Sequence, residues 1–253
     1  RFCVDYRQLN SITKKDSHPL PKIDELVMSL AGSSWFSTLD LQSGYWQVPM
    51  DEGDKEKTAF CTPGGLWQFR VMPFGLCNAP ATFQRAMAAM LREEIRLGRV
   101  KVYLDDILLD NADFEEHVEW LKRVFMVLRK GNVKLNPKKC CLFARDVSYL
   151  GYIISEKGIE TDPRKTEKVR EWPVPTTVKE VRSFVGMCSY YRSFVKGFAD
   201  IMLPLYALQD KTHVFKWDKN CQAAFDHIKQ ALTQPPILGH PIKGALFILD
   251  TDA

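Results

Sequence analysis

Two adjacent acidic residues, Asp105 and Asp106, interrupt an apolar run that extends from Val100 to Leu109. Valine, leucine and isoleucine before and after the pair predict two short strands that bury one face. Because Asp is disfavoured inside strands and tolerated in turns, the pair predicts the tip of a tight hairpin. Two carboxylates held so close repel each other unless a cation lies between or above them. A solvated acidic turn fits the same residues, so the pair alone does not decide the function.

The composition is that of a globular protein, with 45% hydrophobic and 26% charged residues among 253. This length allows one large domain or two smaller ones. The net charge of +4 permits a nucleic-acid partner without requiring one. No apolar run approaches the roughly 20 residues of a membrane span, and no signal peptide is predicted. The first residue is Arg1 and the last residues follow a strand-like pattern, so we expect a piece of a longer protein.

Cysteine and histidine usage gives no sign of a metal or disulfide framework. The seven cysteines show no paired C-x-x-C spacing. An odd number without such spacing favours free thiols in a reducing compartment. The five histidines are scattered and are not arranged with cysteines as zinc ligands.

Periodicity and capping signals predict mixed helices and strands. Helices are expected over residues 23–30 and 78–98, after the capping boxes Asp113/Glu116 and Thr177/Glu180, and over residues 198–209 and 218–232. Strands are expected over residues 35–41, 45–48 and 147–154, with a hairpin of residues 58–62 and 67–71 around a Pro-Gly-Gly turn. Residues 155–175 are charged and punctuated by proline, which predicts a domain boundary. This order predicts an α+β domain on an antiparallel sheet, followed by a small helical domain.

A third carboxylate, Asp40, lies inside the otherwise apolar strand predicted over residues 35–41. If this strand and the Asp105–Asp106 hairpin are neighbours in one sheet, the three acids converge on its open face. Three carboxylates without a nearby histidine suit Mg²⁺, which binds through a few carboxylates and substrate phosphates. Two such ions activate an attacking hydroxyl and stabilise a leaving pyrophosphate. The acids are therefore consistent with nucleotidyl transfer.

Eight blocks of the sequence cover most of the chain: VDYRQLN (4–10), FSTLDLQSGYWQVPM (36–50), KTAFCTPGGLWQFRVMPFGLCNAPATFQRAM (57–87), VYLDDILL (102–109), YLGYIIS (149–155), SFVGMCSYYRSFV (183–195), FKWDKNCQAAFDHIKQAL (215–232) and LDTDA (249–253). In this order they resemble the reverse transcriptase of gypsy-type LTR retrotransposons (Metaviridae) and, more distantly, the retroviral enzymes. A match in so many blocks is far more specific than any one motif.

The resemblance implies roles for individual residues. YLDD is similar to the family's Y-x-D-D box, so Asp105 and Asp106 take metal-carboxylate roles. Asp40 resembles the third carboxylate, and the carbonyl of Leu41 completes the coordination shell. The expected cofactor is two Mg²⁺ ions, with Mn²⁺ as an alternative.

Three residues are implied in nucleotide binding. Tyr45 resembles the aromatic residue beneath the incoming sugar, where its ring excludes a ribose 2′-hydroxyl; packing as a core tyrosine is the alternative. Arg1 resembles the arginine that grips the triphosphate, although a solvated terminal residue remains an alternative. Phe74 occupies a site near the nucleotide where retroviral enzymes have glutamine, and simple turn packing also explains it.

The remaining implied residues bind the primer–template or belong to a further site. Leu150, Gly151 and Tyr152 resemble the primer grip, where glycine allows close approach of the backbone. The helix after Thr177 resembles the thumb helix, in which Gly186 allows close approach to the duplex and Tyr190 contacts sugar; core packing explains its apolar residues. Asp252 resembles the first carboxylate of an RNase H site. Because the other acids of that site are absent from the chain, no RNase H activity is expected from it.

The resemblance therefore predicts a right-hand polymerase fold in three parts. Residues 1–155 form palm and partial fingers with an antiparallel sheet, residues 156–212 a helical thumb, and residues 213–253 a connecting helix and the first strand of an RNase H-like domain. The expected function is RNA-directed and DNA-directed DNA synthesis by two-metal catalysis. The expected partners are a primed RNA or DNA template, dNTPs and the remainder of the Pol polyprotein with its RNase H and integrase. No membrane partner is expected and a homodimer stays open. The expected location is cytoplasmic, in the virus-like particles of the element.

Two other classes remain open at this point. A domesticated or degenerate copy would bind nucleic acid without catalysis, although the intact Asp40, Asp105 and Asp106 set argues against decay. A polymerase of the group II intron or telomerase type is the second, and the closing LDTDA block argues against it. The family's N-terminal fingers segment, with its nucleotide-facing lysine, is not in the sequence.

Overall fold

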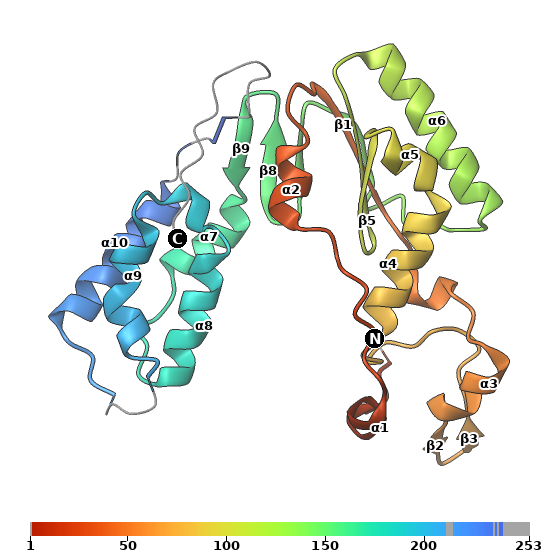
Figure 1. The fold of residues 1–253 in the computed structure, drawn as a ribbon, viewed down its shortest axis with the longest axis horizontal. Helices are drawn as coiled ribbons and strands as arrows, with labels where there is room; N and C mark the ends of the chain where they lie inside the picture. The colour runs from red at the N-terminus through yellow and green to blue at the C-terminus, as the bar shows by residue number, and fades with distance from the viewer. Residues whose placement is uncertain (1, 211–214, 235, 237, 240–253) are drawn as a thin grey trace. The chain divides into compact units, whose positions relative to one another are not determined.

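The computed structural model describes residues 2–210, 215–234, 236 and 238–239 (Figure 1). The chain folds into two compact units, Arg1–Val147 and Ser148–Ala253. The predicted domain boundaries after residues 155 and 212 stay predictions.

Unit 1 is built on a four-stranded antiparallel sheet in the order β4–β5–β1–β6. Its strands are β1 (Trp35–Asp40), β4 (Val100–Tyr103), β5 (Asp106–Asn111) and β6 (Cys141–Ala144). β4 and β5 form the predicted hairpin, and β1 lies beside β5 as the sequence analysis required. The α+β prediction is confirmed.

Helices α4 (Ala79–Met90) and α6 (Phe114–Lys130) share one core with this sheet (Figure 1). Helix α6 begins as predicted, because the Asp113 side chain accepts a hydrogen bond from the Glu116 amide at 2.9 Å. The core that these elements share is fully buried, and its members include Leu39, Phe83, Met87, Ile107, Leu109 and Val124. This packing makes the sheet a rigid support for residues at its edge.

Shorter elements complete unit 1. They are α1 (Arg7–Ile12), α2 (Ile23–Met28), η1 (Gly44–Gln47), α3 (Glu52–Lys55), η2 (Glu56–Thr58), β2 (Phe60–Thr62), β3 (Gly65–Trp67) and α5 (Arg92–Arg96). Strands β2 and β3 form a hairpin as a separate two-stranded ribbon, but its second strand is Gly65–Trp67 and not the predicted residues 67–71.

Unit 2 combines a three-stranded sheet with a helical cluster. The sheet is β7 (Asp146–Tyr149), β8 (Tyr152–Ser155) and β9 (Gly158–Thr161), in that order. The helical elements are α7 (Pro163–Arg170), α8 (Val178–Ser189), η3 (Arg192–Phe194), α9 (Phe198–Ala207) and α10 (Lys219–Thr233). In the buried core of unit 2, the ring centroids of Phe184 from α8 and Phe225 from α10 lie 4.7 Å apart. The three helices predicted after residue 176 are confirmed as α8, α9 and α10.

Several predicted elements were wrong in detail. Residues 45–48 are not a strand, because Ser43 adopts a left-handed conformation (φ 53°) and the chain turns into the 3₁₀ helix η1. The helix predicted over residues 78–98 breaks at Leu91, whose ψ of 24° separates α4 from α5. Strand β9 and helix α7, both within residues 155–175, were not predicted. Strand β6 was not predicted.

Two further observations concern the helices and the cysteines. None of the helices that the structure describes combines the length and apolar character needed to cross a bilayer. All seven cysteines are free thiols, as the spacing predicted.

A buried polar network joins α6 to the sheet of unit 1. His117 Nε2 lies 2.7 Å from Ser37 Oγ, and His117 Nδ1 lies 2.8 Å from Asn111 Oδ1. All three residues are fully buried. Burial lowers the pKa of His117 below its ordinary value of 6.5, so the ring stays neutral in the folded protein. The network fixes α6 against β1 and β5 without a buried charge.

The free energy of unfolding should therefore decrease as the pH falls below about 6.5. In that range the unfolded chain binds a proton at His117 more readily than the folded protein does, because burial lowers the pKa of this histidine in the folded state. Urea unfolding between pH 8 and pH 5 measures this slope. An exposed histidine provides the control, since His227→Asn should leave the slope unchanged. The assignment is wrong if His117→Gln, measured as a folded protein, keeps the wild-type slope.

Candidate active site

Asp40 and Asp106 are directly opposite each other in the antiparallel pair β1–β5. Asp40 is the last residue of β1 and Asp106 is the first residue of β5, so both carboxylates lie at the same end of these two central strands. Like charges at directly opposite positions destabilise a sheet. The register that brings them together is therefore held by the rest of the strands rather than by this pair.

The third acid, Asp105, lies in the turn between β4 and β5. The turn consists of Leu104 and Asp105, while Asp106 is already paired with Tyr103. The prediction that both aspartates form the hairpin tip was therefore half wrong. Leu104 has a φ of 54°, which a non-glycine residue rarely adopts. This places Asp105 in a tightly defined, strained turn.

Gln84 of α4 fixes that turn through two hydrogen bonds to the backbone of the hairpin. Its Oε1 accepts a hydrogen bond from the Leu104 amide at 2.7 Å, and its Nε2 donates to the Val102 carbonyl at 3.1 Å. Gln84 is 3% exposed, so its amide has no water to compete for these bonds. The sequence analysis missed this residue, although a glutamine on the apolar side of a predicted helix is a detectable signal.

Gly44 makes room for the Asp105 carboxylate. A Cβ atom at position 44 would lie 2.1 Å from Asp105 Oδ1 and 2.8 Å from Phe83 Cζ. The φ of Gly44 is not in the left-handed region, so space rather than backbone conformation requires glycine here. This need for space was not predicted from the sequence.

Negative charge exceeds positive charge around Asp40 and Asp106. Burial raises the pKa of Asp106, and the neighbouring charge of Asp40 raises it further, while Lys139 acts in the opposite direction. The Asp106 side chain reaches solvent but is closely flanked by protein, so its desolvation is partial. Lys139 Nζ lies 3.4 Å from Asp40 Oδ2 and is itself well exposed. A movable ammonium group thus compensates part of the acidic charge.

This arrangement fits a hard divalent cation. Carboxylate oxygens are the ligands that Mg²⁺ prefers, and a cation relieves the repulsion between Asp40 and Asp106. Within the described residues, however, no group of three or more Asp, Glu, His or Cys side chains is gathered closely enough to hold an ion. Asp40 and Asp106 are therefore the two carboxylates placed to share a cation, and Asp105 precedes Asp106 in the chain.

The aromatic residues of the predicted nucleotide site form one cluster beside Asp105. The Tyr45 ring lies 5.4 Å from Phe74 and 5.4 Å from Phe83, and Trp46 packs on Phe74 at 5.6 Å. Burial raises the pKa of Tyr45, and the Asp105 charge adds to this effect. Leu41 follows Asp40 with its side chain buried in the core. The predicted residues Arg1 and Asp252 lie outside the described residues.

The predicted primer-binding residues lie in unit 2. Leu150 and Gly151 form the turn between β7 and β8, and Tyr152 begins β8. Gly186 and Tyr190 are both exposed and four positions apart near the end of α8, so they share one side of the helix. The structure thus brings together two groups of predicted residues, one in each unit.

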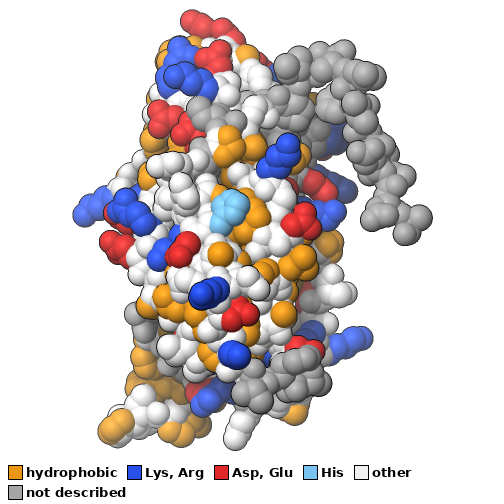
Figure 2. All heavy atoms as spheres, turned by 90° about the vertical axis from the view of Figure 1, so that its left-hand side faces the viewer, with side chains coloured by type: hydrophobic (Ala, Val, Ile, Leu, Met, Phe, Trp, Pro, Cys, Tyr) orange, Lys and Arg blue, Asp and Glu red, His pale blue; other side chains and the backbone are white. Residues whose placement is uncertain are grey.

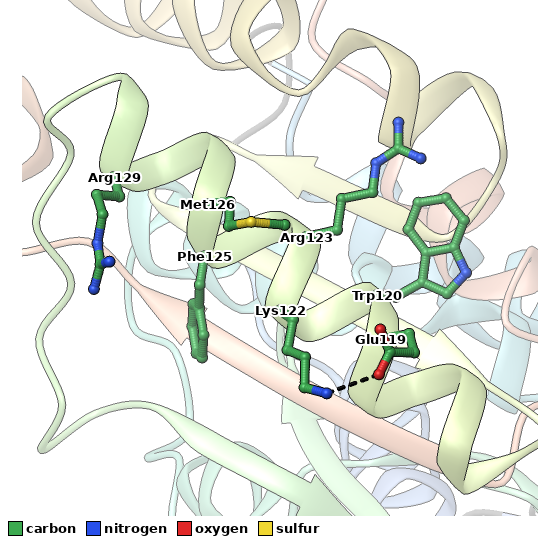
Figure 3. Close-up of a pocket in the computed structure, with 7 residues that line it drawn as sticks. All are labelled: Glu119, Trp120, Lys122, Arg123, Phe125, Met126 and Arg129. Atoms are coloured by element: carbon green, nitrogen blue, oxygen red, sulfur yellow. Dashed lines mark hydrogen bonds and ion pairs between the residues drawn. The ribbon is translucent and has the colours of Figure 1, made fainter.

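One groove of unit 1 lies apart from the three aspartates. A groove of about 640 Å³ follows the outer side of α6, and its lining includes Trp120, Phe125 and Met126 (Figure 3). None of the three aspartates lines it, so it lies outside the candidate site. On the face drawn in Figure 2, basic, acidic and hydrophobic side chains are interspersed. The positive charge is not gathered into a single field on that face.

Comparison with protein families gives two matches. The model described as "Reverse transcriptase (RNA-dependent DNA polymerase)" matches residues 1–154. The model described as "RNase H-like domain found in reverse transcriptase" matches residues 217–253.

The similar curated proteins are long polyproteins of transposons. The chain is 39% identical over 254 residues to the retrovirus-related Pol polyprotein from transposon 297 of Drosophila melanogaster, covering 100% of this chain and 24% of the relative. It is 38% identical over 253 residues to that from transposon 412 of the same organism, covering 100% and 20%. It is 37% identical to the transposon Tf2-3 polyprotein of Schizosaccharomyces pombe, covering 100% and 19%. The chain therefore spans about a quarter or less of the length of these relatives.

Solved structures with the same fold include foamy viral protease–reverse transcriptases. One in complex with double-stranded DNA is 27% identical with a TM-score of 0.87, covering 95% of this chain and 42% of that one. Another, in complex with an RNA/DNA hybrid, is 27% identical with a TM-score of 0.82, covering 93% and 32%.

Gly44→Ala should slow nucleotidyl transfer about 100-fold, since the added methyl group displaces the Asp105 carboxylate by on the order of 1 Å. The free energy of unfolding should fall by about 2 kcal/mol, because the added methyl group also overlaps the buried Phe83 ring. Single-turnover primer extension and urea unfolding measure the two effects. Gly53→Ala is the matched control, as its Cβ would meet only Asp51 Oδ1 at 3.5 Å. Wild-type rates in Gly44→Ala would show that the position of Asp105 is unimportant.

Asp106→Asn should raise the free energy of unfolding of the metal-free protein at pH 7 by about 0.5 kcal/mol, because it removes repulsion with Asp40. The melting temperature should rise accordingly. The folded-state pKa of Asp106 is raised, so its ionisation destabilises the fold above its ordinary pKa of 3.8. The difference between variant and wild type should vanish as the pH falls towards that value.

Millimolar Mg²⁺ should raise the melting temperature of the wild type and have much less effect on Asp106→Asn. Differential scanning fluorimetry with and without MgCl₂ measures both differences. Glu119→Gln, a change of an exposed carboxylate on α6, is the control and should respond to Mg²⁺ like the wild type. An equal response of Asp106→Asn would place the cation elsewhere.

Proposed function

The chain belongs to the family of reverse transcriptases (RNA-dependent DNA polymerases), and from this premise we propose that it synthesises DNA on a primed RNA or DNA template. In the proposed reaction the primer 3′-hydroxyl attacks the α-phosphate of a dNTP. A phosphodiester bond forms and pyrophosphate leaves. The acidic hairpin beside β1 is the part of the chain that performs this chemistry.

The observation that carries the proposal is the register of β1 against β5. It sets Asp40 opposite Asp106, with Asp105 in the adjoining turn. The proposed metal ligands are Asp40, Asp105 and Asp106, with the carbonyl of Leu41. Two Mg²⁺ ions bound there, or Mn²⁺ in their place, would favour deprotonation of the 3′-hydroxyl and neutralise charge on the triphosphate. The protein contributes fixed positions: the sheet holds Asp40 and Asp106, and Gln84 and Gly44 hold Asp105.

Tyr45 is the proposed selector of the sugar. Its ring is packed between Phe74 and Phe83 and cannot move without disturbing both. A fixed ring next to Asp105 excludes the extra hydroxyl of a ribonucleotide by steric overlap. Ribonucleotide incorporation by a Tyr45→Val variant is the measurement that tests this role. Phe74 and Arg1 are proposed to contact the base and the triphosphate.

The proposed partners follow from the relatives and the family. Leu150, Gly151 and Tyr152 bind the primer strand, while Gly186 and Tyr190 contact the duplex. Two of the similar structures are complexes with double-stranded DNA and with an RNA/DNA hybrid, which supports a duplex partner. We place the chain in a Pol polyprotein with RNase H and integrase, and in cytoplasmic particles of its element. Self-association as a homodimer is tested by sedimentation velocity.

Asp105→Asn and Asp40→Asn should each reduce primer extension by at least about 1,000-fold, because loss of one charged ligand removes transition-state stabilisation. The experiment measures incorporation of dNTPs on a primed RNA template with Mg²⁺. Glu119→Gln is the control for carboxylate-to-amide exchange on the surface and should extend like the wild type.

Two results would contradict the proposal. Extension that persists in Asp105→Asn or Asp40→Asn excludes these residues as metal ligands. Salt-dependent binding of the wild type to duplex without any incorporation favours a nucleic-acid-binding protein without catalysis.

A further inference from the structure

The turn between β7 and β8 adopts a conformation that its sequence does not favour. Leu150 has a φ of 48° and Gly151 a φ of 83°. Positive φ at both central positions is typical of the tightest hairpin turns, where Asn and Gly are the preferred residues. Glycine adopts this conformation freely, whereas leucine does not. An interaction outside the turn must therefore hold Leu150.

Two consecutive tyrosines supply that interaction. The Tyr190 hydroxyl donates a short hydrogen bond to the Leu150 carbonyl. The Tyr191 hydroxyl donates to the Gly151 carbonyl at 2.9 Å, and this carbonyl also accepts from the Asp162 amide at 3.2 Å. Both carbonyls of the strained turn are thus bound by side chains that follow α8.

The contact is reciprocal. The Tyr152 hydroxyl donates to the Tyr190 carbonyl at 3.1 Å. The Tyr152 ring stacks on Tyr190 at 5.4 Å and meets Tyr191 edge-on at 5.6 Å, with Phe194 at 6.0 Å on another side. The turn residue and the two tyrosines therefore fix each other through rings and hydroxyls.

The two tyrosines differ in exposure. Tyr191 is 1% exposed, and Tyr190 is 38% exposed. Burial raises the pKa of Tyr191 above its ordinary value, so its hydroxyl remains a donor throughout the physiological range. Tyr190 keeps one side of its ring at the surface, on the same side of the helix as Gly186. A side chain at position 151 would also crowd them, since its Cβ would lie 3.2 Å from the Tyr191 hydroxyl oxygen.

We propose that Tyr190 and Tyr191 are positioning residues that lock the Leu150–Gly151 turn to the end of α8. The turn and the exposed side of α8 then present one rigid surface to the primer–template duplex. The lock acts on binding of the duplex and not on the carboxylates of unit 1. This inference rests on the proposed polymerase function, in which Leu150–Tyr152 binds the primer strand.

Tyr190→Phe and Tyr191→Phe test the lock, because each removes one hydroxyl and keeps the ring. Hydrogen–deuterium exchange of the amides in residues 149–155 should become about three- to tenfold faster in either variant. Extension in the presence of a heparin trap should give products at least about threefold shorter, while the KM for dNTP remains at the wild-type value. Circular dichroism confirms that each variant is folded.

Tyr206→Phe is the matched control in the same unit. Its hydroxyl makes no hydrogen bond to other described residues, and its ring is 39% exposed. It should leave both the exchange rates and the product lengths unchanged.

Each outcome separates the two proposals. A wild type that extends no primer overturns the polymerase function, and the exchange rates still decide whether the lock exists. Wild-type exchange in both Phe variants overturns the lock. Faster exchange with unchanged product length overturns the positioning role, because the hydroxyls then support only the fold.

Discussion

The register of β1 against β5 is the constraint on which the site depends. Because side chains alternate across a strand, a shift by one residue would turn Asp40 and its neighbours to the opposite face. The register is secured by residues away from the acids. Ile107, Leu108 and Leu109 of β5 are completely buried. At the other end of the strands, Ser33 donates to Asp110 Oδ2 at 2.7 Å, and Lys101 forms a buried ion pair with the same carboxylate.

The two ends of this strand pair use their acids in opposite ways. Asp110 is 4% exposed and has a cation and a hydroxyl as permanent partners, so its charge is compensated inside the fold. Asp40 and Asp106 face each other, and among the described residues the exposed Lys139 is the charge that compensates them. The first arrangement stabilises the hairpin, and the second leaves a surplus of negative charge at the edge of the sheet. That surplus is what a divalent cation requires.

The sequence predicted those parts of the fold that are specified locally. Helix α6 follows from its capping box and periodicity, and the β4–β5 hairpin from its alternation. The three aspartates became candidates because carboxylates in apolar strands are unusual. Gln84, Gly44 and Lys139 were missed, because their roles arise from contacts with residues distant in the sequence: the Gln84 contact spans 20 positions and the Lys139 contact 99. The 3₁₀ helix η1 was missed because a short apolar run has no decisive period.

The same kind of interaction, a hydrogen bond between a side chain and the backbone, fixes the two turns on which the proposed function depends. Leu104 and Leu150 are both leucines at positive φ, and both lie at the tip of a hairpin. In each case a polar side chain from a helical segment bonds the backbone of the turn: Gln84 holds Leu104, and Tyr190 holds Leu150. A glycine at either position would adopt the conformation without help but would leave the turn free to move. Leucine with an external hydrogen bond gives one conformation, which positions a carboxylate in unit 1 and a segment of backbone in unit 2.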